Sequence, residues 1–408
     1  MFLGQGLRVL IQAAYFVVIA RSLGVQSYGS FVGVTALMAV VAPFVGNGAA
    51  SLLVKNVSRD HSLFPEYWGN GILTILTSGA VLSLLALGVG RFALPRSIPT
   101  FLIAVICLSD VILLPLGDFA GITFQAFERL GRCAQLNVLS TLSRLIAAAL
   151  LAITMRYPGA LQWGYLYLGS TFASTSIAMV LVCREFGLPR LALRRILPES
   201  REGFFFSISQ SARTIYNDVD KTMLARLSTL EATGIYGAAY RLIDVSFAPI
   251  RSLLYAAYPR FFQHGAHGLT SSAAFARRLM LRATAVSLAI FFAVVLAAPI
   301  IPHILGSEYD RSVEALRWLA LLPLFKSAHH LTADALTGAG YQGLRTSIQV
   351  SVAVMNVGIN LWLIPAYGWR GAAWSSLASD GLLAAMMVVC LSVLITRDHQ
   401  SASVDQLA

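Results

Sequence analysis

Charge is the scarcest property of this chain. Of its 408 residues only 12% are Asp, Glu, Lys or Arg, against about 25% in soluble globular domains, and 57% are hydrophobic. The mean hydropathy is +0.71. So few polar side chains cannot cover a water-soluble particle of this size, and most of the chain must therefore face lipid.

Catalytic and nucleotide-binding motifs are missing as well. The sequence has no GxxxxGK[ST] phosphate-binding loop, no HExxH metal motif and no GxSxG nucleophile motif. Its four cysteines lie in or beside apolar stretches and lack the spacing of metal ligands. We therefore expect no enzyme activity, no metal or other cofactor, and no disulfide. The 30 basic residues are dispersed, which argues against a nucleic-acid partner.

Long charge-free runs are what the sequence has instead. They cover 22–54, 69–90, 157–183, 283–307 and 346–369. A helix needs roughly 20 apolar residues to cross the hydrocarbon core of a bilayer. The runs recur to the C-terminus, which excludes a single signal peptide, and they are too continuous for the strands of a transmembrane barrel.

The apolar runs and the breaks between them predict an all-α, polytopic membrane protein with about twelve transmembrane helices. These lie near 5–20, 30–54, 69–90, 100–127, 134–155, 162–183, 203–226, 233–258, 282–305, 313–338, 346–366 and 371–396. The longest basic connection, 184–202, divides them into two six-helix lobes, 1–183 and 203–396, and leaves a tail at 397–408.

The orientation follows from the basic residues of the connections. If the N-terminus is cytoplasmic, the inner connections hold 16 Lys and Arg and the outer ones hold 7. Because positive residues favour the cytoplasmic side, both termini and the linker are predicted to be cytoplasmic.

An internal repeat supports the two lobes. The segment "ARSLGVQSYGSF", with Arg21 and Gly29, recurs as "ARLSTLEATGIYGAAY", with Arg226 and Gly237, at offsets of 205 and 208 residues. An even number of helices in each lobe gives both copies one orientation, so the repeat is parallel about an axis along the membrane normal. Two such lobes that meet at a central cleft are typical of transporters.

Charged residues fall inside the predicted helices, seven of each sign. A charge in mid-bilayer must face protein or water, and mutual pairing would neutralise all of these. Some, however, share a helix face at three- and four-residue spacing with other polar groups. These are Ser209, Arg213, Asn217 and Asp220 in 203–226; Arg241, Asp244, Arg251 and Tyr255 in 233–258; and Lys326, His330 and Asp334 in 313–338. We expect such stripes to line a water-filled cavity between the lobes.

Two roles are expected for these stripes. Arginine binds phosphate oxygens in a bidentate manner and stays charged when partly desolvated, so Arg213, Arg241 and Arg251 would bind a phosphate-bearing substrate. Because the chain has no ATP motif, directional transport needs another energy source. Lys326, His330 and Asp334 would couple transport to a proton or cation gradient, since histidine titrates near neutral pH.

Several motifs resemble the oligosaccharide flippase (polysaccharide biosynthesis protein) family of the multidrug/oligosaccharidyl-lipid/polysaccharide exporter superfamily. They are "IARSLGVQSYG" at 19–29, "DKTMLARLSTLEATGIYGAAYRL" at 220–242, "YPRFF" at 258–262, "LGSEY" at 305–309 and "NLWLIPAYGWRGAAWSS" at 360–376. The last is fairly specific for the family, and the likeness runs over nearly the whole chain. The family's common aspartate of the seventh helix falls on Asp220.

The resemblance implies a flippase of the bacterial inner membrane. Such a protein moves a polyprenyl-pyrophosphate-linked oligosaccharide repeat unit to the periplasmic leaflet by alternating access, for O-antigen lipopolysaccharide or exopolysaccharide. The implied partners are that lipid-linked oligosaccharide, the membrane lipids, and the glycosyltransferases and polysaccharide polymerase of the same synthesis.

Two other functions stay open from the sequence. One is an ion-coupled multidrug exporter of the same superfamily, which would bind cationic drugs with acidic and aromatic side chains, whereas a pyrophosphate needs uncompensated arginine. The predicted helices contain seven basic and seven acidic residues, and these equal numbers do not decide between the two substrates. A membrane glycosyltransferase or polymerase would show a large periplasmic loop with clustered acids or arginines, and the outer connections here are short. The peptidoglycan-precursor flippase is disfavoured, because those relatives have fourteen spans.

Overall fold

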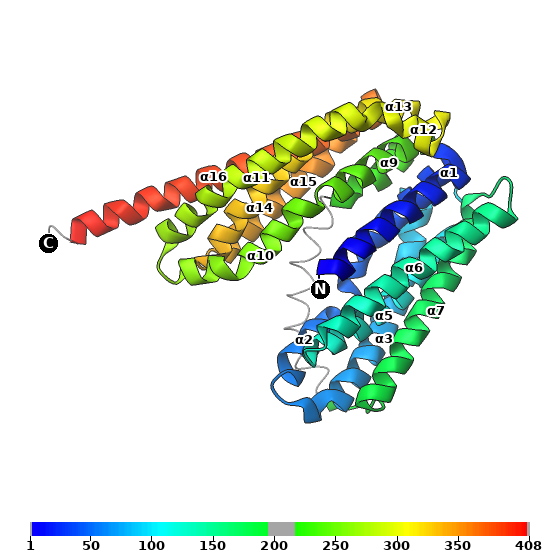
Figure 1. Cartoon of the computed structure of the whole chain (residues 1–408), viewed down its shortest axis with the longest axis horizontal. Coiled ribbons are helices and arrows are strands. Elements are labelled where there is room, and N and C mark those ends of the chain that lie inside the picture. The colour runs from blue at the N-terminus through cyan, green and yellow to red at the C-terminus, as the bar shows by residue number, and fades with distance from the viewer. Residues whose placement is uncertain (1, 195–216, 406–408) are drawn as a thin grey trace. The chain divides into compact units, whose positions relative to one another are not determined.

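The computed structural model describes residues 2–194 and 217–405, and within these ranges every regular element is a helix (Figure 1). Eight helical stretches in the described part are long and apolar enough to cross a membrane. The prediction of an all-α, multi-pass membrane protein is confirmed. Many large apolar side chains point outward, as in Phe92 and Ile153, which are 79% and 84% exposed, and such side chains are stable only against lipid.

The chain divides into two compact units, Met1–Gly234 and Ile235–Ala408, and the boundary lies within α9 (Leu230–Ser246). The sequence placed the boundary between the lobes at the linker 184–202 instead, of which residues 195–202 lie outside the described part. The lobe limits 1–183 and 203–396 therefore stay a prediction.

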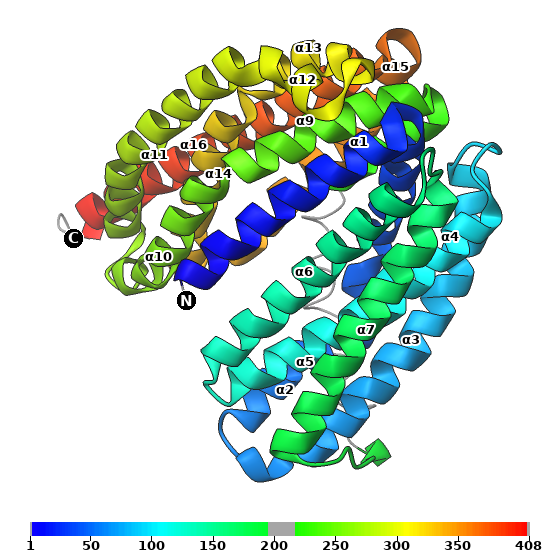
Figure 2. The same cartoon turned by 45° about the vertical axis from the view of Figure 1, so that its right-hand side comes forward.

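The first unit is a bundle of long helices. Its elements are α1 (Phe2–Val41), η1 (Ala42–Gly48), α2 (Ala49–Val57), η2 (His61–Leu63), α3 (Phe64–Ala93), α4 (Thr100–Cys107), the π-helical turn η3 (Leu108–Leu113), α5 (Leu114–Ala126), α6 (Leu130–Thr154), α7 (Ala160–Phe186) and a helix at 217–227. Within this unit α1 lies beside α6, and α6 beside α7 (Figure 2).

Two glycines determine the course of α1, one by a kink and the other by a close contact with α9. Gly24 has φ 70° and ψ 170°, a conformation that side chains larger than hydrogen rarely adopt, so α1 kinks between the predicted segments 5–20 and 30–54. Gly29 lets α1 meet the start of α9: a Cβ there would lie 1.8 Å from the carbonyl oxygen of Leu230. Gly234 of α9 lies equally close to α1, since a Cβ added there would lie 2.0 Å from the carbonyl oxygen of Val25.

The start of the linker is bound to the first unit. Asn70 Nδ2 donates to the Ala192 carbonyl at 3.0 Å, and the Ala192 N–H donates back to Asn70 Oδ1 at 2.9 Å. The Arg190 N–H donates to the Pro65 carbonyl at 2.8 Å. Near the same end of α3, Asp60 caps η2 and accepts hydrogen bonds from the hydroxyl and N–H of Ser62, which lower the pKa of the Asp60 carboxyl.

The second unit is also helical. Beyond α9 it contains α10 (Ala248–Gly265), α11 (Leu269–Ala297), η4 (Ala298–Ile300), α12 (Ile301–Leu305), η5 (Ser307–Tyr309), α13 (Asp310–Leu319), α14 (Leu322–Gly338), α15 (Gln342–Tyr367) and α16 (Trp369–Asp405). Helix α14 is central, because it packs against α10, α11 and α16, and α15 packs along α16. The predicted helices 233–258 and 313–338 each appear as two shorter helices, α9 with α10 and α13 with α14.

Candidate functional site

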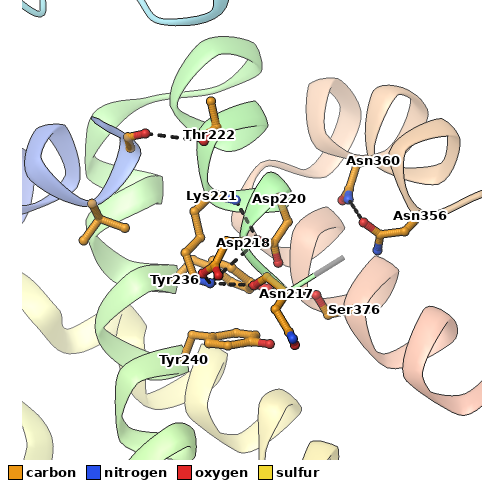
Figure 3. Close-up of polar contacts among 12 residues, drawn as sticks. Asn217, Asp218, Asp220, Lys221, Thr222, Tyr236, Tyr240, Asn356, Asn360 and Ser376 are labelled. Carbon is orange, nitrogen blue, oxygen red and sulfur yellow. Dashed lines mark hydrogen bonds and ion pairs between the residues drawn. The ribbon is translucent and has the colours of Figure 1, made fainter. Parts of the chain in front are cut away.

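The polar stripe of the predicted seventh helix is described from Asn217 onward. Lys221 Nζ donates to the Asn217 carbonyl and to Asp218 Oδ1, both at 2.7 Å (Figure 3). Asp220 is fully buried; its Oδ1 accepts the Lys221 N–H at 2.7 Å and lies 3.9 Å from Lys221 Nζ. The predicted cavity carboxylate is therefore held beside a cation on its own helix. Ser209 and Arg213 lie outside the described residues.

The stripe of the predicted eighth helix is divided by a break in the helix. Helix α9 ends at Ser246 and α10 begins at Ala248, with Pro249 in its first turn, where a missing N–H costs nothing. Arg241 and Asp244 are half-buried on α9, whereas Arg251 and Tyr255 are exposed on α10.

No acid of the described residues forms an ion pair with either arginine of this stripe. The only polar contact of Arg251 with a described residue is a long one, from Nη2 to the Asp244 carbonyl oxygen at 3.5 Å, and its guanidinium lies 6.0 Å from the Phe247 ring. Neither Arg241 nor Arg251 forms an ion pair with a carboxylate of the described residues.

The three residues predicted for ion coupling lie on α14, but each contacts a different neighbour. Lys326 Nζ donates to the Tyr240 hydroxyl of α9 at 2.8 Å, and Asp334 lies 3.5 Å from Arg345 of α15. The ring of His330 lies 4.3 Å from that of His329, between centroids. Asp334 thus has one ion-pair partner on the next helix, α15.

A buried polar group next to this trio was missed from the sequence. His329 Nε2 lies 3.3 Å from Asp380 Oδ1 of α16, and both side chains are almost completely buried. On α15, Asn360 Nδ2 donates to Asn356 Oδ1 at 3.0 Å (Figure 3). Asn356 Nδ2 donates in turn to Ser379 Oγ of α16 at 2.9 Å. Asp380 is one of the seven acidic residues inside the predicted helices, but its neighbour on α14 is decided by packing.

A second charged cluster lies in the first unit, where the sequence assigned no site. The Tyr167 hydroxyl of α7 donates to Asp110 Oδ1 of η3 at 2.8 Å, and the Arg144 guanidinium of α6 lies 4.8 Å from the centre of the Tyr167 ring. Asp118 of α5 is within electrostatic range of Arg144. The signal for this cluster was three charges in two otherwise apolar predicted helices, 100–127 and 134–155, with no spacing rule to connect the two.

Comparison with known proteins places these observations in a family and a fold. Residues 1–264 match the family described as polysaccharide biosynthesis protein. None of the curated proteins matches the sequence.

The fold resembles solved structures of transporters of the MOP superfamily. An inward-facing multidrug resistance MATE family transporter of the MOP superfamily gives a TM-score of 0.77 at 15% identity, over 95% of this chain and 95% of that one. The lipid II flippase MurJ in an inward closed conformation gives 0.74 at 10% identity, over 96% and 87%. A MOP superfamily transporter from Pyrococcus furiosus gives 0.62 at 15% identity, over 96% and 93%. At these identities the likeness shows a shared fold, with its pseudo-repeat lobes.

Proposed function

The chain belongs to the polysaccharide biosynthesis protein family, and we propose that it moves a polyprenyl-pyrophosphate-linked oligosaccharide repeat unit across the bacterial inner membrane by alternating access. The glycosyltransferases that build the unit and the polymerase that joins the units would act before and after it. Its product would be a surface polysaccharide such as O-antigen or exopolysaccharide. The fold it shares with the lipid II flippase supports a lipid-linked substrate.

The observation that carries this proposal is that Arg241 and Arg251 of the second unit form no ion pair with a carboxylate of the described residues. A sugar chain and a pyrophosphate cannot cross hydrocarbon unaided, whereas the polyprenyl tail can stay in lipid. The protein therefore has to supply cations that hold the phosphates and are not already neutralised. Arg241 and Arg251 meet this condition among the described residues.

The other residues of the stripes have supporting roles in this proposal. Asn217, Asp220, Asp244 and Tyr255 contact the sugars or orient the arginines, and Arg213 adds a third cation. Lys326, His330 and Asp334 exchange a proton or cation as the cavity alternates between the two sides. This assignment rests on their shared helix faces and on the burial of Lys326 and Asp334.

The test is transport by the purified protein. A fluorescent polyprenyl-pyrophosphate oligosaccharide is placed in both leaflets of proteoliposomes. A membrane-impermeant quencher then reaches only the probe molecules in the outer leaflet. Active protein should raise the quenched fraction from about one half towards all of the probe. If the fraction stays at one half while the same vesicles accumulate a cationic dye, the protein is a multidrug exporter. If the oligosaccharide is lengthened or transferred, it is a glycosyltransferase or polymerase.

A further inference from the structure

The start of the linker, residues 187–194, is not used by the proposed function. Its sequence is GLPRLALR, in which leucine and arginine recur and no acid occurs. It directly follows the apolar stretch that ends at Phe186, and it is bonded to the first turn of α3, whose own apolar stretch begins at His61. Because both stretches are long enough to cross a membrane, the start of the linker lies at a boundary between membrane and water.

The chain leaves α7 by a sharp turn. Gly187 has φ 107° and ψ 175°, a conformation that larger residues rarely adopt, and α7 ends before it. Pro189 follows, and it can neither donate a backbone hydrogen bond nor continue a helix interior. Residues 187–192 are accordingly not helical, and their backbone groups need partners elsewhere.

Helix α3 provides these partners and holds the segment by its backbone. The Arg190 N–H donates to the Pro65 carbonyl at 2.8 Å, and the buried Asn70 side chain bonds both the N–H and the carbonyl of Ala192. Gly69 permits this close approach, since a Cβ there would lie 2.3 Å from the Arg190 carbonyl oxygen. Three hydrogen bonds therefore fix the backbone, whatever its side chains touch.

The side chains of the segment point away from the first unit. Leu188, Leu191 and Leu193 are 75%, 59% and 61% exposed, and Arg190 and Arg194 are exposed beside them. Three leucines that no helix covers, interleaved with arginines at the end of a span, have the composition of a segment that lies in the membrane interface.

The charge of the segment selects the kind of lipid. Arg190 and Arg194 form no ion pair with a carboxylate of the described residues. The nearest acid in the sequence, Glu185, is bound by Arg129 and by Arg132, the latter at 3.3 Å. The two guanidiniums thus suit the phosphate of an anionic headgroup, while the leucines enter the boundary between headgroups and acyl chains.

We propose that residues 187–194 form a binding site for anionic phospholipid, in which Arg190 and Arg194 bind the headgroup phosphate and the three leucines enter the bilayer surface. Asn70 and Gly69 are positioning residues, because they hold the backbone of the segment and do not touch the lipid. The linker would then leave the first unit along the membrane surface. This inference does not depend on which substrate the protein moves.

Quenching of a fluorophore by labelled lipid tests the site. Protein in which serine replaces the four native cysteines carries Leu191→Cys, labelled with the fluorophore. It is placed in nanodiscs of phosphatidylcholine with increasing amounts of nitroxide-labelled phosphatidylglycerol, and the mole fraction that gives half-maximal quenching is measured. Arg190→Gln and Arg194→Gln should each raise this fraction about fivefold, because each removes one cation from an anionic surface.

Two matched controls accompany these variants. Arg156→Gln removes an exposed arginine from the connection before α7, at the opposite end of that helix, and should leave the half-maximal fraction unchanged. Gly69→Ala should raise the fraction, because the methyl group displaces Arg190 and the lipid must then order a released segment. Gly88→Ala on the same helix should not, since a Cβ there meets nothing within 4 Å.

A second measurement uses the protein with its native cysteines, in case their replacement prevents folding. Native mass spectrometry counts the phosphatidylglycerol molecules that stay bound at one lipid concentration. The double variant Arg190→Gln/Arg194→Gln should retain fewer of them than the wild type, and Arg156→Gln should retain as many. Equal numbers in the wild type and the double variant overturn the site.

Three outcomes of the quenching experiment would also overturn the proposal. Equal quenching by nitroxide-labelled phosphatidylcholine would show an apolar contact without selection of anionic headgroups. Quenching by aqueous iodide alone would show that the leucines lie in water. Shielding from both lipid and iodide would show that protein covers the segment.

Discussion

Arg241 and Arg251 form no ion pair with a carboxylate of the described residues, and this makes their substitution informative. We expect alanine at Arg213, Arg241 or Arg251 to abolish or strongly reduce surface polysaccharide while the protein level stays near normal, because phosphate binding is lost. Lysine should restore only part of the export, since it lacks the bidentate fork. Polysaccharide on intact cells is compared by immunoblot with protein level. Arg91→Ala, at the exposed end of α3, serves as the control. Normal export by all three alanine variants would refute the cavity assignment.

At the scale of single residues, substitution of Asp334 tests whether this carboxylate couples transport to an ion gradient or only stabilises the fold. If it exchanges a proton or cation, Asp334→Asn should remove stimulation of transport by an imposed gradient and leave gradient-independent exchange of the lipid-linked sugar. Arg345→Gln breaks the same 3.5 Å pair but keeps the carboxylate, so stimulation should survive in it. Both activities are measured in proteoliposomes with matched protein content. Equal loss of both in the two variants would instead indicate a structural pair.

At the scale of helices, the first unit depends on a close crossing of α1 with the start of α9. Alanine at Gly29 or Gly234 would place a methyl group about 2 Å from a carbonyl oxygen, and neither helix can yield without moving away. We expect each substitution to lower the free energy of unfolding by roughly 1–3 kcal/mol or more, as overpacking usually does. Thermal unfolding of the purified protein measures this. Gly88→Ala and Gly169→Ala are matched controls, because a Cβ at either meets nothing within 4 Å. An equal loss of stability in these controls would show that the effect does not come from the crossing.

The two copies of the internal repeat meet at this crossing. Gly29 lies in the first copy, "ARSLGVQSYGSF", and Leu230 and Gly234 lie in the second. The two copies therefore pack against each other within the first unit. A small residue at such a contact lets two helix backbones approach, which is how helices commonly associate in membranes.

At the scale of the whole molecule, the excess of basic residues on one side predicts the orientation. A reporter that is active only in the periplasm should stay inactive when it is fused after Arg195, because the linker is predicted to be cytoplasmic. The same reporter fused after Arg156, in an outer connection, should be active. Activity of the Arg195 fusion would reverse the topology, and the proposed direction of transport with it.

The sequence alone was enough to establish the class of the protein. Its 12% of charged residues and repeated apolar runs require an all-α membrane protein, because lipid satisfies no backbone polar group and helices satisfy their own. Its motifs led to the family, and its apolar runs placed seven charges of each sign inside the predicted helices. What it could not determine is which of these charges are neutralised. That Asp334 pairs with Arg345, that Asp380 lies beside His329, and that Arg144 rests on Tyr167 rather than on Asp110 follow from contacts between helices far apart in the chain. Helical spacing relates residues only within one helix, whereas the packing of several helices decides which cations keep a free edge for a ligand.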